Sequence, residues 1–300
     1  MKGFIVNRET DASGLVLIHK AEGYTSFETL HAIKKYYKTG KVGHAGTLDR
    51  FASGLLVVAV GRATRLLPYF TSLDKWYEAT IRFGRETDTL DPEGAIVREG
   101  PVPSLENLQE AINRFRGTYE QVPPAYSALH VEGKRASERA RRGESVELAP
   151  RPVTIYALEL LDFIEGRARL VIHCSKGTYI RSLARDLARE AASCAYVERL
   201  CRLAVGPFHL KDAVPGSGER GFPLQRPNAE LARRLGMEVY HVSDGAVIRA
   251  IRQGVPPHRC IPNLPEEKLL VALVQDQEEL IAIIQREGTL WRYGCVYDHP

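Results

Sequence analysis

Two strand-like segments joined by a very short link constrain the fold of this chain most. Residues 151–163 and 167–175 have the pattern of strands, and Glu165 and Gly166 between them are typical of a hairpin turn. Strands joined so closely can pair only antiparallel. Alternating residues predict a further strand over 75–83, and short apolar runs predict strands over 14–19 and 55–60.

Three segments have helical signals. Residues 26–37 are amphipathic behind Ser26 as the expected N-cap, and residues 178–190 form a second predicted helix. A third lies behind Ser104, where we expect apolar side chains at helical spacing to pack into the core: Leu105, Leu108, Ala111, Ile112 and Phe115. Strands with helices on one side predict an α+β fold with a mixed, largely antiparallel sheet.

The length of 300 residues exceeds the usual size of one domain. Glycine, proline and charged residues dominate positions 215–226, and short strands are expected at 269–275 and 280–285. The chain is therefore expected to divide into a main domain over 1–225 and a small β-rich domain over 238–300. Within the first, a Gly-, Ser- and Arg-rich stretch at about 123–152 predicts a mobile insertion that orders on a partner.

Charge and cysteine usage narrow the class of protein. With 44% apolar and 26% charged residues, and no long apolar run, the chain reads as an ordered protein that is neither secreted nor membrane-spanning. Five cysteines without paired spacing predict cytoplasmic free thiols rather than disulfides or a zinc site. The net charge of +4 is small, but the basic residues are concentrated in the middle of the chain. They are interpreted either as a polyanion-binding face or as the solvated faces of ordinary helices. These residues are Lys134, Arg135, Arg139, Arg141, Arg142, Arg181, Arg185, Arg189, Arg199 and Arg202.

One acidic residue lies in a glycine-bracketed loop directly before an apolar strand. It is Asp49, within GHAGTLDRFASGLL at 43–56. Such a loop can present a carboxylate at a sheet edge, although an aspartate at this position is more often a turn former. The segment resembles the catalytic motif of TruB-type pseudouridine synthases, and further segments resemble that family's motifs in the same order: 23–26, 75–79, 84–94, 121–128, 174–182 and 200–204.

The resemblance implies a pseudouridine synthase fold with a PUA-like C-terminal domain. It also implies isomerisation of uridine 55 in the T-arm of tRNA, with the base flipped out of its stack. The reaction cleaves the base from the ribose C1′ and rejoins it through C5, so neither a metal nor a cofactor is expected. We expect a monomer that needs no guide RNA, because the longer basic extensions of guide-dependent relatives are absent.

The same resemblance assigns roles to individual residues. Asp49 is the expected catalytic carboxylate and nucleophile, Arg181 its ion-pair partner, and Tyr77 the ring that packs on the flipped base and takes part in proton transfer. His44 helps to fill the space that the base leaves, and Asp88 and Asp91 support their loop. Tyr179 and Leu200 line the pocket, and a set of cations is expected to contact RNA: Lys20, Arg62, Lys134, Arg141 and Arg142.

This chain departs from the family pattern at a few positions. Ala21 and Arg50 stand where the family usually has proline, His130 replaces a usual lysine, and the usual tyrosine is missing from 137–141. A non-catalytic RNA-binding or tRNA-folding protein on the same scaffold is therefore the alternative. Retention of Asp49 together with its expected partners favours the enzyme, since a pure binder does not need that set.

Overall fold

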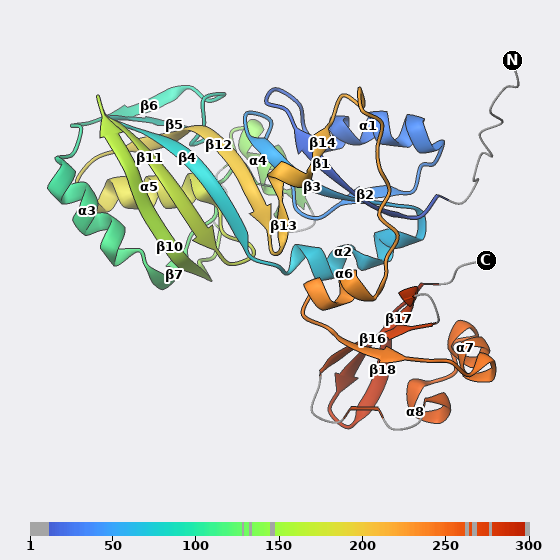
Figure 1. Ribbon diagram of the computed structural model, residues 1–300. Helices are drawn as coiled ribbons and strands as arrows, with labels where there is room; N and C mark the ends of the chain where they lie inside the picture. Colours follow the sequence, from blue (N-terminus) through green and yellow to red (C-terminus); the bar gives the residue numbers. More distant parts are fainter. Residues whose placement is uncertain are drawn as a thin grey trace, which may run out of the picture.

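The main sheet of the protein is mixed and largely antiparallel. The computed structural model describes residues 12–127, 129–131, 134–144, 148–261, 264–265, 269–275 and 278–297. Within them ten strands form the sheet (Figure 1). Two of the ten lie off its main path: β2 (Val42–His44) pairs with β3, and β13 (Phe208–His209) pairs with β12. Its main path runs β14 (Val214–Pro215), β1 (Gly14–Lys20), β3 (Ser53–Val60), β12 (Ala195–Val205), β4 (Lys75–Phe83), β11 (Arg167–Cys174), β10 (Arg151–Ile164) and β7 (Gly117–Gln121).

The expected hairpin is present. β10 and β11 pair antiparallel, and Glu165 and Gly166 both have positive φ, at 50° and 74°, as a tight hairpin turn requires. Among the described strands of this sheet, parallel pairing occurs only locally, between β1 and β14 and between β3 and β12. The predicted α+β class with a mixed, largely antiparallel sheet is thus confirmed.

Helices cover the sheet in two halves (Figure 1). α3 (Leu105–Arg114) and α5 (Ile180–Glu190) pack on the inward side chains of β4, β10, β11 and β12. The strand β4 alternates strictly between buried and half-buried side chains, so only one of its faces, with Tyr77, enters this core. α1 (Ser26–Tyr37) covers β1 and β3 instead.

Two local predictions need correction. The N-cap of α1 is Thr25 rather than Ser26: its hydroxyl accepts from the amide of Glu28, whose carboxylate accepts from the amide of Thr25. In α3, Ser104 is the N-cap as expected, but Leu105 is exposed because only the face with Leu108, Ala111 and Ile112 meets the core.

The C-terminal part forms a second sheet, β15 (Glu238–His241), β16 (Leu270–Val274), β17 (Leu280–Glu287) and β18 (Leu290–Val296). One face of β1 and β3 packs against α1. The opposite face packs in a common core with this second sheet, α2 (Leu67–Thr71) and α6 (Ala229–Arg234). The strands β16 and β17 agree with those predicted. Beside them lie α7 (Gly245–Arg252) and α8 (Pro257–Cys260).

The remaining elements are short. They are two small hairpins, a helix that follows one of them, and two 3-10 helices: β5 (Arg85–Thr87) with β6 (Ile96–Glu99), β8 (His130–Val131) with β9 (Lys134–Arg135), α4 (Ala136–Arg141), η1 (Gly61–Leu66) and η2 (Leu210–Asp212). Among the described residues no helix is both long and apolar enough to cross a membrane.

Candidate active site

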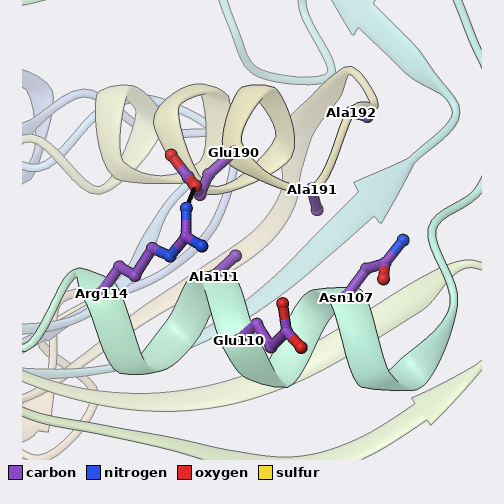
Figure 2. A pocket seen from close by; sticks show the side chains of 7 residues that line it. All are labelled: Asn107, Glu110, Ala111, Arg114, Glu190, Ala191 and Ala192. Carbon is purple, nitrogen blue, oxygen red and sulfur yellow. Dashed lines mark hydrogen bonds and ion pairs between the residues drawn. The ribbon is translucent and has the colours of Figure 1, made fainter.

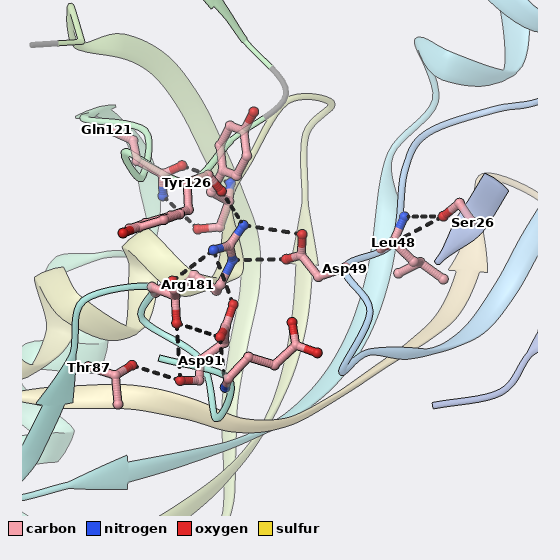
Figure 3. A network of polar contacts seen from close by, with 11 residues as sticks. Ser26, Leu48, Asp49, Thr87, Asp91, Gln121, Tyr126 and Arg181 are labelled. Carbon is pink, nitrogen blue, oxygen red and sulfur yellow. Dashed lines mark hydrogen bonds and ion pairs between the residues drawn. The ribbon is translucent and has the colours of Figure 1, made fainter. Parts of the chain in front are cut away.

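The loop between β2 and β3 holds Asp49 between two fixed neighbours. The amide of Leu48 donates to the Oγ of Ser26 at 2.8 Å, and that hydroxyl donates back to the Leu48 carbonyl at 3.1 Å. The amide of Ala52 donates to the Asp49 carbonyl at 3.1 Å, which closes a tight turn. The backbone is therefore pinned on both sides of Asp49, and its carboxylate points toward α5 (Figure 3).

Gly54 allows the strand after this loop to lie against β12. It has φ of 114°, and a Cβ there would lie 2.4 Å from backbone atoms of Arg202. Only glycine fits such an approach without moving the two strands apart. The glycine at the end of the motif thus fixes where the Asp49 loop lies relative to Arg202.

Arg181 lies at the centre of the polar network in Figure 3. Its Nε is 2.9 Å from Oδ2 of Asp49, and its Nη2 donates to Oδ1 at 3.2 Å. The same guanidinium donates to the carbonyl of Thr89 at 2.7 Å and to that of Tyr126 at 2.9 Å. One side chain therefore joins the Asp49 loop, the 84–94 loop and the start of the 123–152 stretch to the first turn of α5.

Asp91 is a second carboxylate on the same guanidinium. Its Oδ2 is 3.3 Å from Nη1 of Arg181, and its Oδ1 accepts from the Thr89 hydroxyl at 2.5 Å and the Glu93 amide at 3.1 Å. Burial raises the pKa of the Asp91 carboxyl, and Thr89 and Arg181 oppose that shift. Asp91 is only 7% exposed, whereas Asp49 is 37% exposed, so Asp49 is the carboxylate presented to a ligand.

Tyr77 and Leu200 lie on neighbouring strands on the α5 side of the sheet. Both belong to the same buried cluster as Leu48, directly before Asp49. Burial raises the pKa of the Tyr77 phenol, partly offset by Arg202, so the phenol is neutral near pH 7. Tyr77 thus offers a ring and an uncharged hydroxyl beside the Asp49 loop.

His44 ends β2, and Tyr179 is the N-cap residue of α5. The Nδ1 of His44 is buried without a hydrogen-bond partner among the described residues. Burial and the nearby Arg202 lower the His44 pKa, which favours the neutral imidazole. Tyr179 precedes α5, where Gln121 holds both its amide and its carbonyl, at 2.8 and 3.2 Å. The ring of Tyr179 lies 4.8 Å below the guanidinium of Arg151.

Lys20 does not have the surface position expected of a phosphate contact. It is fully buried, and its Nζ donates to the carbonyls of Ala21, Tyr24 and Arg50, the residue after Asp49. Burial lowers its pKa from the usual 10.5 to about 8, although Asp49 raises it. Lys20 is therefore a support of the Asp49 loop in the free protein.

The other predicted RNA-binding cations lie on β9, at the end of α4 and after β3. Arg62 follows β3, whereas Asp49 precedes it, so the length of the strand, about 25 Å, lies between them. Arg141 and Arg142 are exposed at the end of α4. Lys134 lies on β9, and its side chain is outside the described part of the structure.

The arginine-rich middle of the chain is not one exposed face. Arg181, Arg185 and Arg202 are buried, and their guanidinium groups bind backbone carbonyls or carboxylates. Arg185 donates to the carbonyl of Val122, as does the hydroxyl of Ser182. The polyanion-face interpretation is therefore wrong for these three, because their side chains turn inward from α5 and β12.

Arg202 supports the Asp49 loop, a role that the sequence analysis did not predict when it named Arg202 among the possible polyanion contacts. It is 1% exposed, its Nε donates to the carbonyl of Leu55 at 2.8 Å, and its Nη2 donates to that of Gly46 at 3.1 Å. Arg202 thus joins Gly46 of the Asp49 loop to Leu55 of β3. Its place in the LCRLA segment was the available signal, but a lone arginine on a strand gives no sign of being buried.

The pocket between α3 and α5 lies elsewhere and is polar (Figure 2). It includes the Arg114–Glu190 ion pair and none of the predicted site residues. No group of three or more His, Cys, Asp or Glu side chains in the described ranges is arranged to hold a metal ion. The polar network around Asp49 is therefore the candidate site.

Known proteins resemble this chain in sequence over most of its length. Residues 34–180 match the model of the TruB family pseudouridylate synthase (N terminal domain). The tRNA pseudouridine synthase B of Borreliella burgdorferi strain ZS7 is 52% identical over 289 residues, which cover 95% of this chain and 99% of the relative. The chain belongs to the TruB family of pseudouridine synthases. The Treponema denticola member is 48% identical, over 79% of this chain and 71% of its own.

Solved structures share the fold at low sequence identity. "Structure of H/ACA RNP bound to a substrate RNA containing 2'-deoxyuridine" matches with a TM-score of 0.68 and 20% identity, over 99% of this chain and 88% of the other. "Crystal Structure of a Cbf5-Nop10-Gar1 Complex" matches with a TM-score of 0.66 and 24% identity, over 96% and 84%. These similarities confirm the pseudouridine synthase fold of this TruB-family chain.

Proposed function

We propose that this chain isomerises uridine to pseudouridine in tRNA, at position 55 of the T-arm loop. The observation that carries the proposal is the partly exposed carboxylate of Asp49, held side-on by the buried guanidinium of Arg181. In the reaction the N1–C1′ bond breaks, a C5–C1′ bond forms, the C5 proton leaves and N1 takes up a proton. These steps need a charged carboxylate and proton transfers, and neither a metal nor an electron carrier.

Asp49 serves as the nucleophile in this proposal. Arg181 aims this carboxylate, since its Nη2 donates to Oδ1 at 3.2 Å and its Nε lies at an ion-pair distance of 2.9 Å from Oδ2. Tyr77 packs on the flipped base as a neutral ring, and its hydroxyl takes part in moving the C5 proton. Leu200 and Tyr179 keep water from the intermediate, and His44 fills the space that the base leaves in the RNA.

The RNA is held by other parts of the chain. We assign α4 with Arg141 and Arg142, and Lys134 on β9, to phosphate contacts of the T-arm. The proposed catalytic domain spans residues 1–225 with its RNA-gripping insertion at 123–152, and a PUA-like domain spans 238–300. In this proposal the protein works as a monomer and needs no guide RNA.

The alternative, an RNA-binding or tRNA-folding protein without catalysis, is not favoured. A binder gains nothing from a partly exposed carboxylate next to the RNA, since a negative charge repels phosphates. Here Arg181 is only 4% exposed and is paired with Asp49. Its charge is therefore not open to an RNA phosphate.

Tritium release tests the proposal. The protein is mixed with an unmodified tRNA transcript that carries 5-tritiated uridine, and a second transcript has cytidine at position 55. We expect the transcript with uridine at position 55 to release one tritium per molecule more than the transcript with cytidine there. Binding of both transcripts without release would instead identify an RNA-binding protein.

A further inference from the structure

One exposed edge of α1 carries aromatic and basic side chains in a row. Phe27, His31, Lys34 and Lys38 follow one another at spacings of four, three and four residues, so they lie on one face of the helix. Tyr24 precedes them by three residues. We call these five residues the α1 edge.

Its aromatic rings are unusually open to solvent. Tyr24 and Phe27 are each 59% exposed, although large aromatic side chains are mostly buried. The ring of Phe27 contacts His31 edge-on at 5.1 Å, and Nζ of Lys34 lies 4.7 Å above it. These contacts orient the ring and leave much of it free for a further planar group.

The α1 edge is fixed to the catalytic loop. Ser26 exchanges hydrogen bonds with Leu48, and the amide of Gly23 donates to the Arg50 carbonyl at 2.9 Å. Arg50 in turn donates from Nε to the Gly23 carbonyl at 2.9 Å. The residues on both sides of Asp49 are therefore tied to the start of α1, and the exposed rings lie at the rim of the site.

Positive charge surrounds these rings. Arg50, bound to Gly23 directly before Tyr24, is exposed, and among the described residues no hydrogen-bond or ion-pair partner occurs at its terminal nitrogens. The acids closest in the chain are Glu22, Glu28 and Asp49: Glu28 is engaged in the cap of α1, and Asp49 is paired with Arg181. Basic groups around free aromatic rings are the combination that single-stranded nucleic acid binds, through phosphates and stacked bases.

We propose that the α1 edge binds an RNA segment next to the flipped nucleotide. An unstacked base rests on Phe27 and Tyr24, and the neighbouring phosphates reach Lys34, whose Nζ lies 4.7 Å from the centre of the Phe27 ring, and Lys38, one turn further along the chain. The proposal rests on the proposed function, since it assumes an RNA substrate at Asp49. It also gives a role to Arg50, which stands where the family usually has proline. A cation at this position adds a phosphate contact to a chain in which His130 replaces the usual lysine.

Binding by two pairs of matched variants tests the proposal. All are made in the full chain with Asp49→Asn, so that the bound RNA is not converted, and the RNA is a T-arm stem-loop at two salt concentrations. Phe27→Ala is matched by Tyr156→Ala, an exposed ring that packs on His173 on the sheet face away from Tyr77. Lys34→Ala is matched by Arg98→Ala on β6, at the other end of the main sheet (Figure 1).

We expect Phe27→Ala to raise the Kd at least fivefold and Lys34→Ala to lower the salt slope by about 0.7 to 0.9. Both controls should bind within twofold of the parent. If Phe27→Ala and Lys34→Ala bind RNA as tightly as Tyr156→Ala and Arg98→Ala, the proposal is overturned. The α1 edge would then be a candidate surface for a protein partner. Tritium release by the chain with Asp49 intact is measured separately, so that failure of the edge is told apart from failure of the proposed function.

Discussion

Arg181 and Asp49 meet side-on, with Nε 2.9 Å from Oδ2 and Nη2 3.2 Å from Oδ1, although 132 positions separate them in the sequence. The arginine is almost fully buried, whereas more than a third of the carboxylate is exposed. The pair is therefore asymmetric: the protein encloses the cation and presents the anion. A cation that served to attract RNA would have the opposite arrangement.

Arg181→Lys should separate these two roles. Lysine keeps the charge but cannot reach Asp49, Asp91 and two carbonyls at once, so we expect the single-turnover rate to fall at least about a hundredfold, roughly 2.7 kcal/mol. The affinity for RNA and its salt dependence should change little. Arg185→Lys, one turn along α5 and without contact to Asp49, is the control. A fast Arg181→Lys enzyme would remove Arg181 from the catalytic set.

Asp91→Asn should destabilise the fold. The substitution removes one of the two carboxylates on a buried guanidinium, so the free energy of unfolding should fall by about 1 to 3 kcal/mol. Urea denaturation measures this change. Asp88→Asn changes an exposed carboxylate of the same loop and should stay within about 0.5 kcal/mol of wild type. Equal stability of the two variants would show that Asp91 is not needed to hold Arg181.

Lys75 should produce a pH dependence of stability in the alkaline range. Its Nζ donates to the carbonyls of Thr71 and Leu73, at 2.7 and 2.5 Å, and burial with nearby Arg202 lowers its pKa from 10.5 to about 8. Between these values the unfolded chain binds more protons than the folded protein, so this lysine makes stability rise with pH there. Below pH 8 both states are protonated and the contribution is constant.

Comparison with Lys75→Met isolates that contribution. The difference in unfolding free energy, wild type minus variant, should increase from pH 8 to pH 10 in urea titrations. The nearby Cys174, Asp74 and Lys176 are present in both proteins, so their own titration largely cancels. A difference that stays flat would show that folding leaves the pKa of Lys75 unchanged, and one that falls with pH would show that folding raises this pKa.

RNA binding should protect α4 from hydrogen exchange. Its basic residues Arg141 and Arg142 are exposed, and the proposal places T-arm phosphates against them. We expect amide exchange within 136–141 to slow at least about tenfold with bound stem-loop RNA. Amides of β18, in the C-terminal sheet, are the internal reference. Unchanged exchange in α4 would remove it from the RNA interface.

The sequence predicted most of the regular elements because each is periodic. The alternation in β4 and the hairpin of β10 and β11 are local patterns, and the structure has them within one or two residues. The N-cap at Thr25 was missed by one position because threonine and serine adjoin there. Leu105 was placed in the core because apolar spacing alone does not reveal where a partner surface ends.

The sequence led to the Asp49–Arg181 pair, which the structure contains, but not to the other contacts around it. Asp49, Tyr77, Arg181 and Leu200 were named from motifs. That Asp91 shares the guanidinium, and that Arg202 and Lys20 support the loop from inside, depends on contacts between segments far apart in the sequence. Burial of a charged side chain is a tertiary property, so a list of basic residues cannot distinguish a support from a phosphate contact.

Asp49→Asn tests the central claim most directly. The amide keeps the shape of the side chain and loses its charge and nucleophilicity, so single-turnover tritium release from saturating tRNA should fall below detection. Because Asp49 is a reacting group and not a phosphate contact, the Kd for tRNA should stay within about tenfold, or 1.4 kcal/mol. Release at near the wild-type rate by a folded Asp49→Asn protein would contradict the account.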